Sequence, residues 1–100
     1  MGRVSRAKQI SRDLDRIFND ISGNNGVNVA IAQLSGIENA FERLGFFPNL
    51  GRNRSDLRSG LRSWSVKPWL GLYRVRDEDV FILRVLDERR NIAALFGQKT

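Results

Sequence analysis

The sequence predicts an α+β fold, in which an N-terminal strand and a helical hairpin pack on a small, mostly antiparallel twisted sheet. Apolar residues recur at helical spacing through the first 44 residues, and from residue 61 onward the period changes to two. One hundred residues supply one hydrophobic core, so residues 1–100 are expected to form a single domain.

A short strand over residues 2–7 and two helices are expected first. The first helix is predicted over residues 8–22, where Gly23 supplies a stop. Its apolar stripe consists of Ile10, Leu14, Ile17, Phe18 and Ile21. The second stripe consists of Ala30, Leu34, Ile37, Phe41 and Leu44, and Gly45 closes it. Because the connector over residues 23–26 is so short, the helices within residues 8–44 should form an antiparallel hairpin.

The second half of the chain is expected to hold an antiparallel sheet between residues 61 and 87. Residues 46–60 have the composition of a loop. Alternating apolar residues then predict strands over residues 61–66, 69–75 and 80–87, with a polar turn at 76–79. Residues 88–100 form a C-terminal tail, in which 91–96 suit a helical turn and 97–100 are polar.

The alternation makes both faces of this sheet apolar. In the last strand, one face is expected to carry Val80, Ile82, Arg84 and Leu86, and the other Phe81, Leu83 and Val85. One helical hairpin covers only one face of a sheet. We therefore expect the second face to be shielded by the 46–60 loop or by another chain.

The charge is positive and unevenly placed. Seventeen Lys and Arg residues against eleven Asp and Glu residues give a net charge of +6. Residues 51–76 alone carry seven basic side chains, mostly arginine, against the single acid Asp56. This pattern fits either a solvated surface or an anionic partner, which would be a nucleic acid or an acidic peptide.

The residue inventory excludes several classes of chemistry. Cys and His are both absent, which removes disulfides, thiol catalysis and the commonest general base and metal ligand. The Asp77-Glu78-Asp79 cluster suits a turn, and no glycine-rich phosphate loop is present. No apolar run is long enough to span a membrane. We expect a cytoplasmic protein that binds no metal or cofactor. Phosphodiester cleavage by Arg, Lys and Tyr side chains alone stays open, but we expect the arginines to pair with acids or with a partner and the protein not to be an enzyme.

Several segments, in their order and spacing, resemble the ParE branch of the RelE/ParE toxins. The resemblance covers nearly the whole chain. It rests on Asp13-Leu14, Phe47-Pro48-Asn49-Leu50-Gly51-Arg52, Gly60-Leu61-Arg62, Leu72-Tyr73-Arg74-Val75 and Val80-Phe81-Ile82-Leu83-Arg84-Val85-Leu86. Asp87 stands where many relatives carry His, so a His-dependent nuclease mechanism is not available here.

The resemblance implies the toxin of a type II toxin–antitoxin pair, neutralised by a ParD-like antitoxin and inhibiting DNA gyrase. For antitoxin contact or sheet integrity, the candidates are Phe46, Phe47, Arg62, Trp69, Tyr73, Arg74 and Arg84. For target contact, the place in the family implies Arg89, Arg90, Leu95 and Phe96.

Other functions are compatible with the same residues. A RelE-like ribosome-dependent mRNA endonuclease would depend on Arg62, Arg74 or Arg84, with Tyr73 as a proton carrier. A basic nucleic-acid-binding module would use the 51–76 stretch, with a steep salt dependence. A toxin that has lost its activity and persists only as an antitoxin partner is the remaining alternative.

Overall fold

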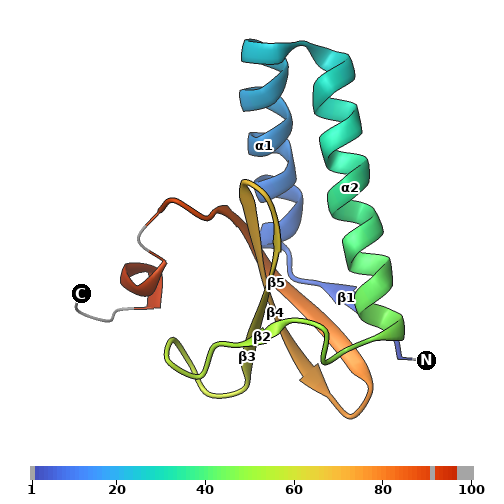
Figure 1. Cartoon of the computed structure of the whole chain (residues 1–100), viewed down its shortest axis with the longest axis vertical. Coiled ribbons are helices and arrows are strands. Elements are labelled where there is room, and N and C mark those ends of the chain that lie inside the picture. Colours follow the sequence, from blue (N-terminus) through green and yellow to red (C-terminus); the bar gives the residue numbers. More distant parts are fainter. Residues whose placement is uncertain (1, 91, 97–100) are drawn as a thin grey trace.

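The computed structural model describes residues 2–90 and 92–96, and it has the expected α+β architecture (Figure 1). In chain order the elements are β1 (Val4–Arg6), α1 (Gln9–Asn25), α2 (Val27–Phe46), β2 (Arg52–Asn53), β3 (Leu61–Val66), β4 (Trp69–Arg76), β5 (Asp79–Asp87) and the 3₁₀ helix η1 (Ala93–Phe96). The predicted 97–100 tail and residue 91 lie outside the described residues. None of the helices described is long and apolar enough to cross a membrane.

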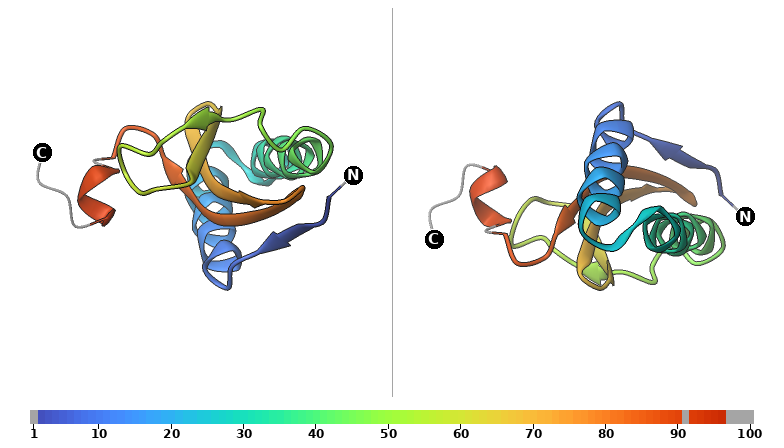
Figure 2. Two further views of the ribbon diagram at one scale, coloured as in Figure 1. Left: turned by 90° about the horizontal axis from the view of Figure 1, so that it is seen from below. Right: turned by 90° about the horizontal axis from the view of Figure 1, so that it is seen from above.

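The five strands form one mixed sheet in the order β1-β5-β4-β3-β2. β1 runs parallel to β5, and the other neighbours are antiparallel. The two helices form an antiparallel hairpin that projects well beyond the sheet (Figure 1), and the C-terminal segment lies beside the loop between β2 and β3 (Figure 2).

The helical hairpin turns at Gly26 and not at Gly23, so the predicted end of the first helix is wrong. Gly23 lies within α1, because one glycine in a helix costs only about 1 kcal/mol and does not by itself end it. Gly26 has a φ of 92°, a conformation that suits glycine, and it is the only residue between the two helices. Gly45 does not close α2 either. It lies where a Cβ would come within 2.9 Å of the Val4 side chain, so it permits the close approach of β1.

Two strand boundaries also differ from expectation. Residues 52–53, predicted as loop, form the short edge strand β2 by pairing with Arg62 and Ser63 of β3. The expected four-residue turn at 76–79 is a two-residue turn, because Arg76 and Asp79 still pair with each other. Asp77 has a φ of 57° in this turn, a left-handed conformation that Asp tolerates.

A β-bulge in β5 reverses the predicted alternation. Tyr73 pairs with Ile82 and Leu72 pairs with Arg84, so Leu83 is an extra residue in β5. The expectation that Val80, Ile82, Arg84 and Leu86 share one face is therefore wrong. Val80 and Ile82 pack with Val85 against the helices, whereas Leu83 and Leu86 pack on the opposite face.

Two apolar clusters occupy the two faces of the sheet. The larger one, between the sheet and the helical hairpin, includes Ile10, Ile17, Ile37, Phe41, Tyr73, Val80 and Ile82. The second consists of Leu57, Leu61, Leu72, Leu86 and Ile92, with Leu70, Leu83 and Ala93 at its margin. The loop that contains Leu57 thus covers part of the second face, as expected if the 46–60 loop shields it. Ile92 of the C-terminal segment covers a further part of this face.

A buried carboxylate joins α1 to β5 beyond the end of β1. β1 ends at Arg6, so the side of β5 that β1 occupies loses its strand partner after Ile82. Asp13, only 3% exposed, accepts the Val85 N–H at 3.0 Å on Oδ2. The same carboxylate binds the Arg84 guanidinium through two hydrogen bonds of 2.9 and 3.1 Å. We call these three residues the Asp13 clamp.

Asp13→Asn should destabilise the fold strongly. It leaves the Arg84 guanidinium without its counter-charge in a largely buried place, which costs about 3 kcal/mol in free energy of unfolding. The measurement is urea denaturation followed by circular dichroism. Asp56→Asn, which breaks the ion pair between Arg54 and the exposed Asp56, is the control and should lower the unfolding midpoint far less. Equal losses in the two variants would contradict the importance of the clamp.

Candidate functional site

Three large apolar side chains are exposed in the turn that ends α2. Phe46, Phe47 and Leu50 are 57%, 62% and 51% exposed. The turn is closed by hydrogen bonds from the Phe47 N–H to the Arg43 carbonyl (2.9 Å) and from the Leu50 N–H to the Phe47 carbonyl (3.0 Å). We call these three residues the apolar patch. Large apolar groups that gather on a surface mark an interaction site.

Tyr73 and Arg62 hold the loop that presents this patch. The Tyr73 hydroxyl donates to the Pro48 carbonyl and accepts the Gly51 N–H, both at 2.8 Å. Arg62 Nη1 donates to the Gly51 carbonyl at 2.8 Å. A Cβ at Gly51 would come within 2.5 Å of the Tyr73 hydroxyl oxygen, so only glycine fits there. Both side chains are therefore committed to interactions within the chain.

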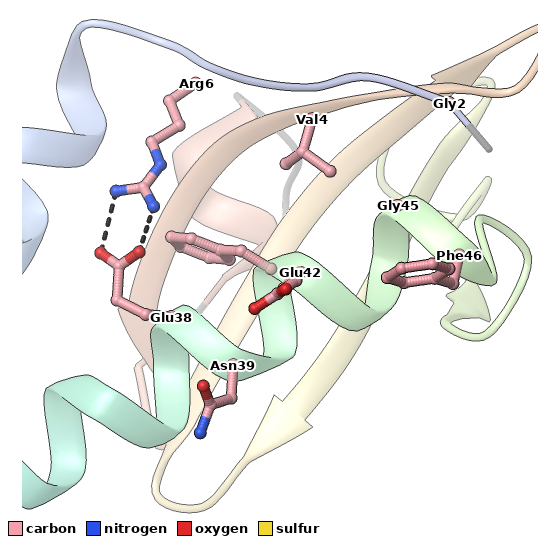
Figure 3. Close-up of a pocket in the computed structure, with 9 residues that line it drawn as sticks. Gly2, Val4, Arg6, Glu38, Asn39, Glu42, Gly45 and Phe46 are labelled. Atoms are coloured by element: carbon pink, nitrogen blue, oxygen red, sulfur yellow. Dashed lines mark hydrogen bonds and ion pairs between the residues drawn. The ribbon is translucent and has the colours of Figure 1, made fainter.

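A groove between β1 and α2 leads to the patch (Figure 3). It has a volume of about 450 Å³ and is lined by Val4, Phe41 and Phe46 together with charged side chains. Arg6 reaches from β1 to Glu38 on α2 with two hydrogen bonds, one from Nη1 to Oε1 at 2.9 Å and one from Nη2 to Oε2 (Figure 3). Its guanidinium lies 4.7 Å from the centre of the Phe41 ring. Because it shares Phe46 with the patch, the groove extends the candidate surface along α2.

The remaining predicted antitoxin residues lie elsewhere. Trp69 is buried and donates from Nε1 to Gln33 Oε1 at 3.0 Å, which joins β4 to α2. Arg84 belongs to the Asp13 clamp. Arg74 is exposed on the face of the sheet that lies away from the helices. The structure thus brings Phe46 and Phe47 together, places Arg74 apart from them, and uses the other four residues inside the fold.

The predicted target-contact residues follow β5 in the C-terminal segment. Arg89 binds Asp87 through its Nε at 2.9 Å, and hydrogen bonds from the Arg89 side chain lower the pKa of Asp87 to about 2. Arg90 is exposed. Leu95 and Phe96 lie in η1, and their side chains are outside the described part.

Other exposed apolar residues were not predicted as site residues. One of them, Leu50, belongs to the motif over residues 47–52 and completes the apolar patch. At the far end of the helical hairpin, Val27, Val29 and Ile31 are 54%, 41% and 52% exposed. The sequence contains one indication that these three residues are exposed, because they lie outside the apolar stripe of the second helix.

The Tyr73 hydroxyl should ionise at a higher pH than the hydroxyl of a free tyrosine. Burial is the main cause that raises its pKa above the usual 10.0. Because the pKa is raised in the folded state, the stability that the neutral phenol contributes is complete below pH 10. It is lost as the pH rises through the folded-state pKa.

Tyr73 is the only tyrosine, so ultraviolet absorbance follows its ionisation directly. The folded chain should titrate at higher pH than the chain in denaturant, and Tyr73→Phe should lack the associated alkaline loss of stability. Coincident titrations of folded and unfolded chains would contradict the buried, hydrogen-bonded hydroxyl.

Comparison with known proteins agrees with this architecture. The family described as the ParE toxin of type II toxin-antitoxin system, parDE, matches residues 4–92. The chain is 62% identical to Toxin ParE3 of Caulobacter vibrioides over 100 residues, with both chains covered completely. A solved structure described as the chromosomal ParDE TA system from P. aeruginosa shares the fold, with a TM-score of 0.76 at 22% identity over 87% of this chain and 96% of that chain. This chain therefore belongs to the ParE toxins of type II toxin–antitoxin systems, as its sequence motifs indicated.

Proposed function

We propose that this toxin is held inactive by a ParD-like antitoxin and, when released, inhibits DNA gyrase by binding and not by chemistry of its own. The observation that carries the antitoxin part is the apolar patch at the end of α2. Its three side chains remain exposed although buried hydrogen bonds fix the loop that carries them. A partner that buries these side chains would recover about 1.5–3 kcal/mol for each.

The membership in the ParE family and the parDE system named for it support an antitoxin of the ParD type. The groove between β1 and α2 supports an elongated partner segment, because it continues from Phe46 along the helix. Four of the predicted antitoxin residues would act indirectly, because they hold in place the elements that contact the antitoxin. These residues are Arg62, Trp69, Tyr73 and Arg84. Arg74 would contact a part of the antitoxin that reaches the other face.

The geometry favours a binding function over mRNA cleavage. Arg62 and Arg84 are engaged with Gly51 and Asp13, and Arg74 is exposed apart from both. Burial raises the pKa of Tyr73, which makes this hydroxyl a poor carrier of protons near neutral pH. The arginines that a nuclease would need do not converge on one cavity with Tyr73.

For the target, the C-terminal segment is the better candidate surface. Ile92 is buried in the second cluster and so anchors the segment to the sheet. Arg89, Arg90, Leu95 and Phe96 flank this anchor on both sides. Because Arg89 is paired with Asp87, Arg90 is the more available cation of the two.

Phe46→Ser with Phe47→Ser should weaken antitoxin binding by roughly 30-fold or more, because the double change removes two exposed apolar anchors. The measurement is calorimetric titration with a ParD-type protein from the neighbouring reading frame. Val27→Ser with Ile31→Ser is the control, since these side chains are about equally exposed at the opposite end of α2. A control that lost as much affinity as the test variant would refute the assignment of the patch.

Leu95→Ser with Phe96→Ser should abolish growth arrest and the loss of plasmid supercoiling in cells, while antitoxin binding is kept. These substitutions are preferable to deleting the segment, because a deletion would also remove the buried anchor Ile92. Undiminished arrest by this variant would contradict the target surface. Arrest of translation with cut transcripts and normal supercoiling would instead indicate an mRNA endonuclease.

A further inference from the structure

A groove on the face of the sheet away from the helices collects cations from three separate parts of the chain. It has a volume of about 550 Å³. Arg52 comes from β2, Lys67 from the turn between β3 and β4, and Arg90 from the segment after β5. Ser63 and Ser65 of β3 also line it. Folding therefore brings three basic side chains that are distant in sequence to one place.

These three cations form no direct ion pair within the described part of the chain, although Asp56 lies near Arg52 and Asp87 lies near Arg90. Arg52, Lys67 and Arg90 are all exposed, and none of them forms an ion pair with another described residue. A fourth cation in the groove, Arg54, is bound to Asp56 at 3.1 Å. The one acid that lines the groove is Glu88, whose Oε2 accepts the Ser65 hydroxyl at 3.1 Å. Three free cations thus face one carboxylate.

The chemistry of the lining selects between two kinds of anion. An acidic peptide docks firmly when its apolar side chains fill pockets between the charges. Here the apolar lining residues are already packed: Leu70, Ile92 and Ala93 in the second cluster, and Trp64 against the larger one. Ile92 is only 7% exposed. The guanidinium and ammonium groups remain for a ligand. Those are the groups that contact the phosphates of a nucleic acid backbone.

We propose that this groove binds the phosphodiester backbone of a nucleic acid, without reading its sequence. Arg52, Lys67 and Arg90 each neutralise a phosphate along the groove. This activity goes beyond the proposed function and does not depend on it, because it belongs to the free chain. Arg90 is shared with the candidate target surface, so a toxin bound through its C-terminal segment to an enzyme that holds DNA would turn the groove toward that DNA.

The test is fluorescence anisotropy of the full chain with three labelled probes of equal length: a random-sequence DNA duplex, oligo-dT and oligo-rU. Each neutralised phosphate contributes about −0.9 to the slope of log affinity against log salt for duplex DNA, and about −0.7 for single strands. Three cations predict a slope of about −2.7 for the duplex. Arg52→Gln with Lys67→Gln should lower it to about −0.9 and weaken binding about tenfold or more. The probe that binds most tightly identifies the natural source of the phosphodiester.

The matched control is Lys8→Gln with Arg12→Gln, which removes two exposed charges at the start of α1, neither of which lines a pocket with the three cations. This control should retain the wild-type slope. Both double variants change exposed side chains, and unfolding in urea confirms that they fold. The proposal is overturned if the control loses as much affinity as the groove variant, since the attraction is then only that of the net charge. It is also overturned if polyglutamate binds the groove more tightly than all three nucleic acids.

Discussion

The arrangement of helices and sheet depends on the carboxylate of Asp13, which occupies the place beside Val85 that a longer β1 would otherwise fill. β1 is too short to accompany β5 along its length, and the bulge at Leu83 turns the Val85 N–H to the uncovered side. Asp13 satisfies this donor and the Arg84 guanidinium together. The first turns of α1 are thereby fixed against β5, and the antiparallel hairpin places the end of α2 beside β1.

A second set of polar interactions holds the loop that follows α2. The Tyr73 hydroxyl and the Arg62 guanidinium secure Pro48 and Gly51, so the turn after α2 is rigidly placed while Phe46, Phe47 and Leu50 stay exposed. Three of the polar residues that suggest catalysis in the sequence, Arg62, Tyr73 and Arg84, therefore serve structure. Three large apolar side chains are exposed at the end of α2 instead of joining the core. This distribution supports the proposal that the toxin acts by binding and that a partner covers the end of α2.

Much of the fold follows from the sequence because apolar periodicity reports burial. The stripes from Ile10 to Ile21 and from Ala30 to Leu44 located both helices, and alternation located β3, β4 and β5. Three details depend on tertiary context. Gly23 and Gly26 look alike locally, and only the backbone at Gly26 has a positive φ. β2 has two residues, too few to show a period. The bulge at Leu83 has no local signature in the sequence, and it places every later residue of β5 on the face opposite to the predicted one.

For the site, Phe46 and Phe47 could be predicted from their position at the start of the motif. The cationic groove could not, because its members are distant in sequence.

The most direct test of the account is a supercoiling assay with purified DNA gyrase, relaxed plasmid and increasing amounts of the full chain. The account predicts that supercoiling stops, that cleaved linear DNA accumulates, and that prior addition of the ParD-type partner prevents both effects. Normal supercoiling at a molar excess of the chain, together with cleavage of mRNA on translating ribosomes, would contradict it.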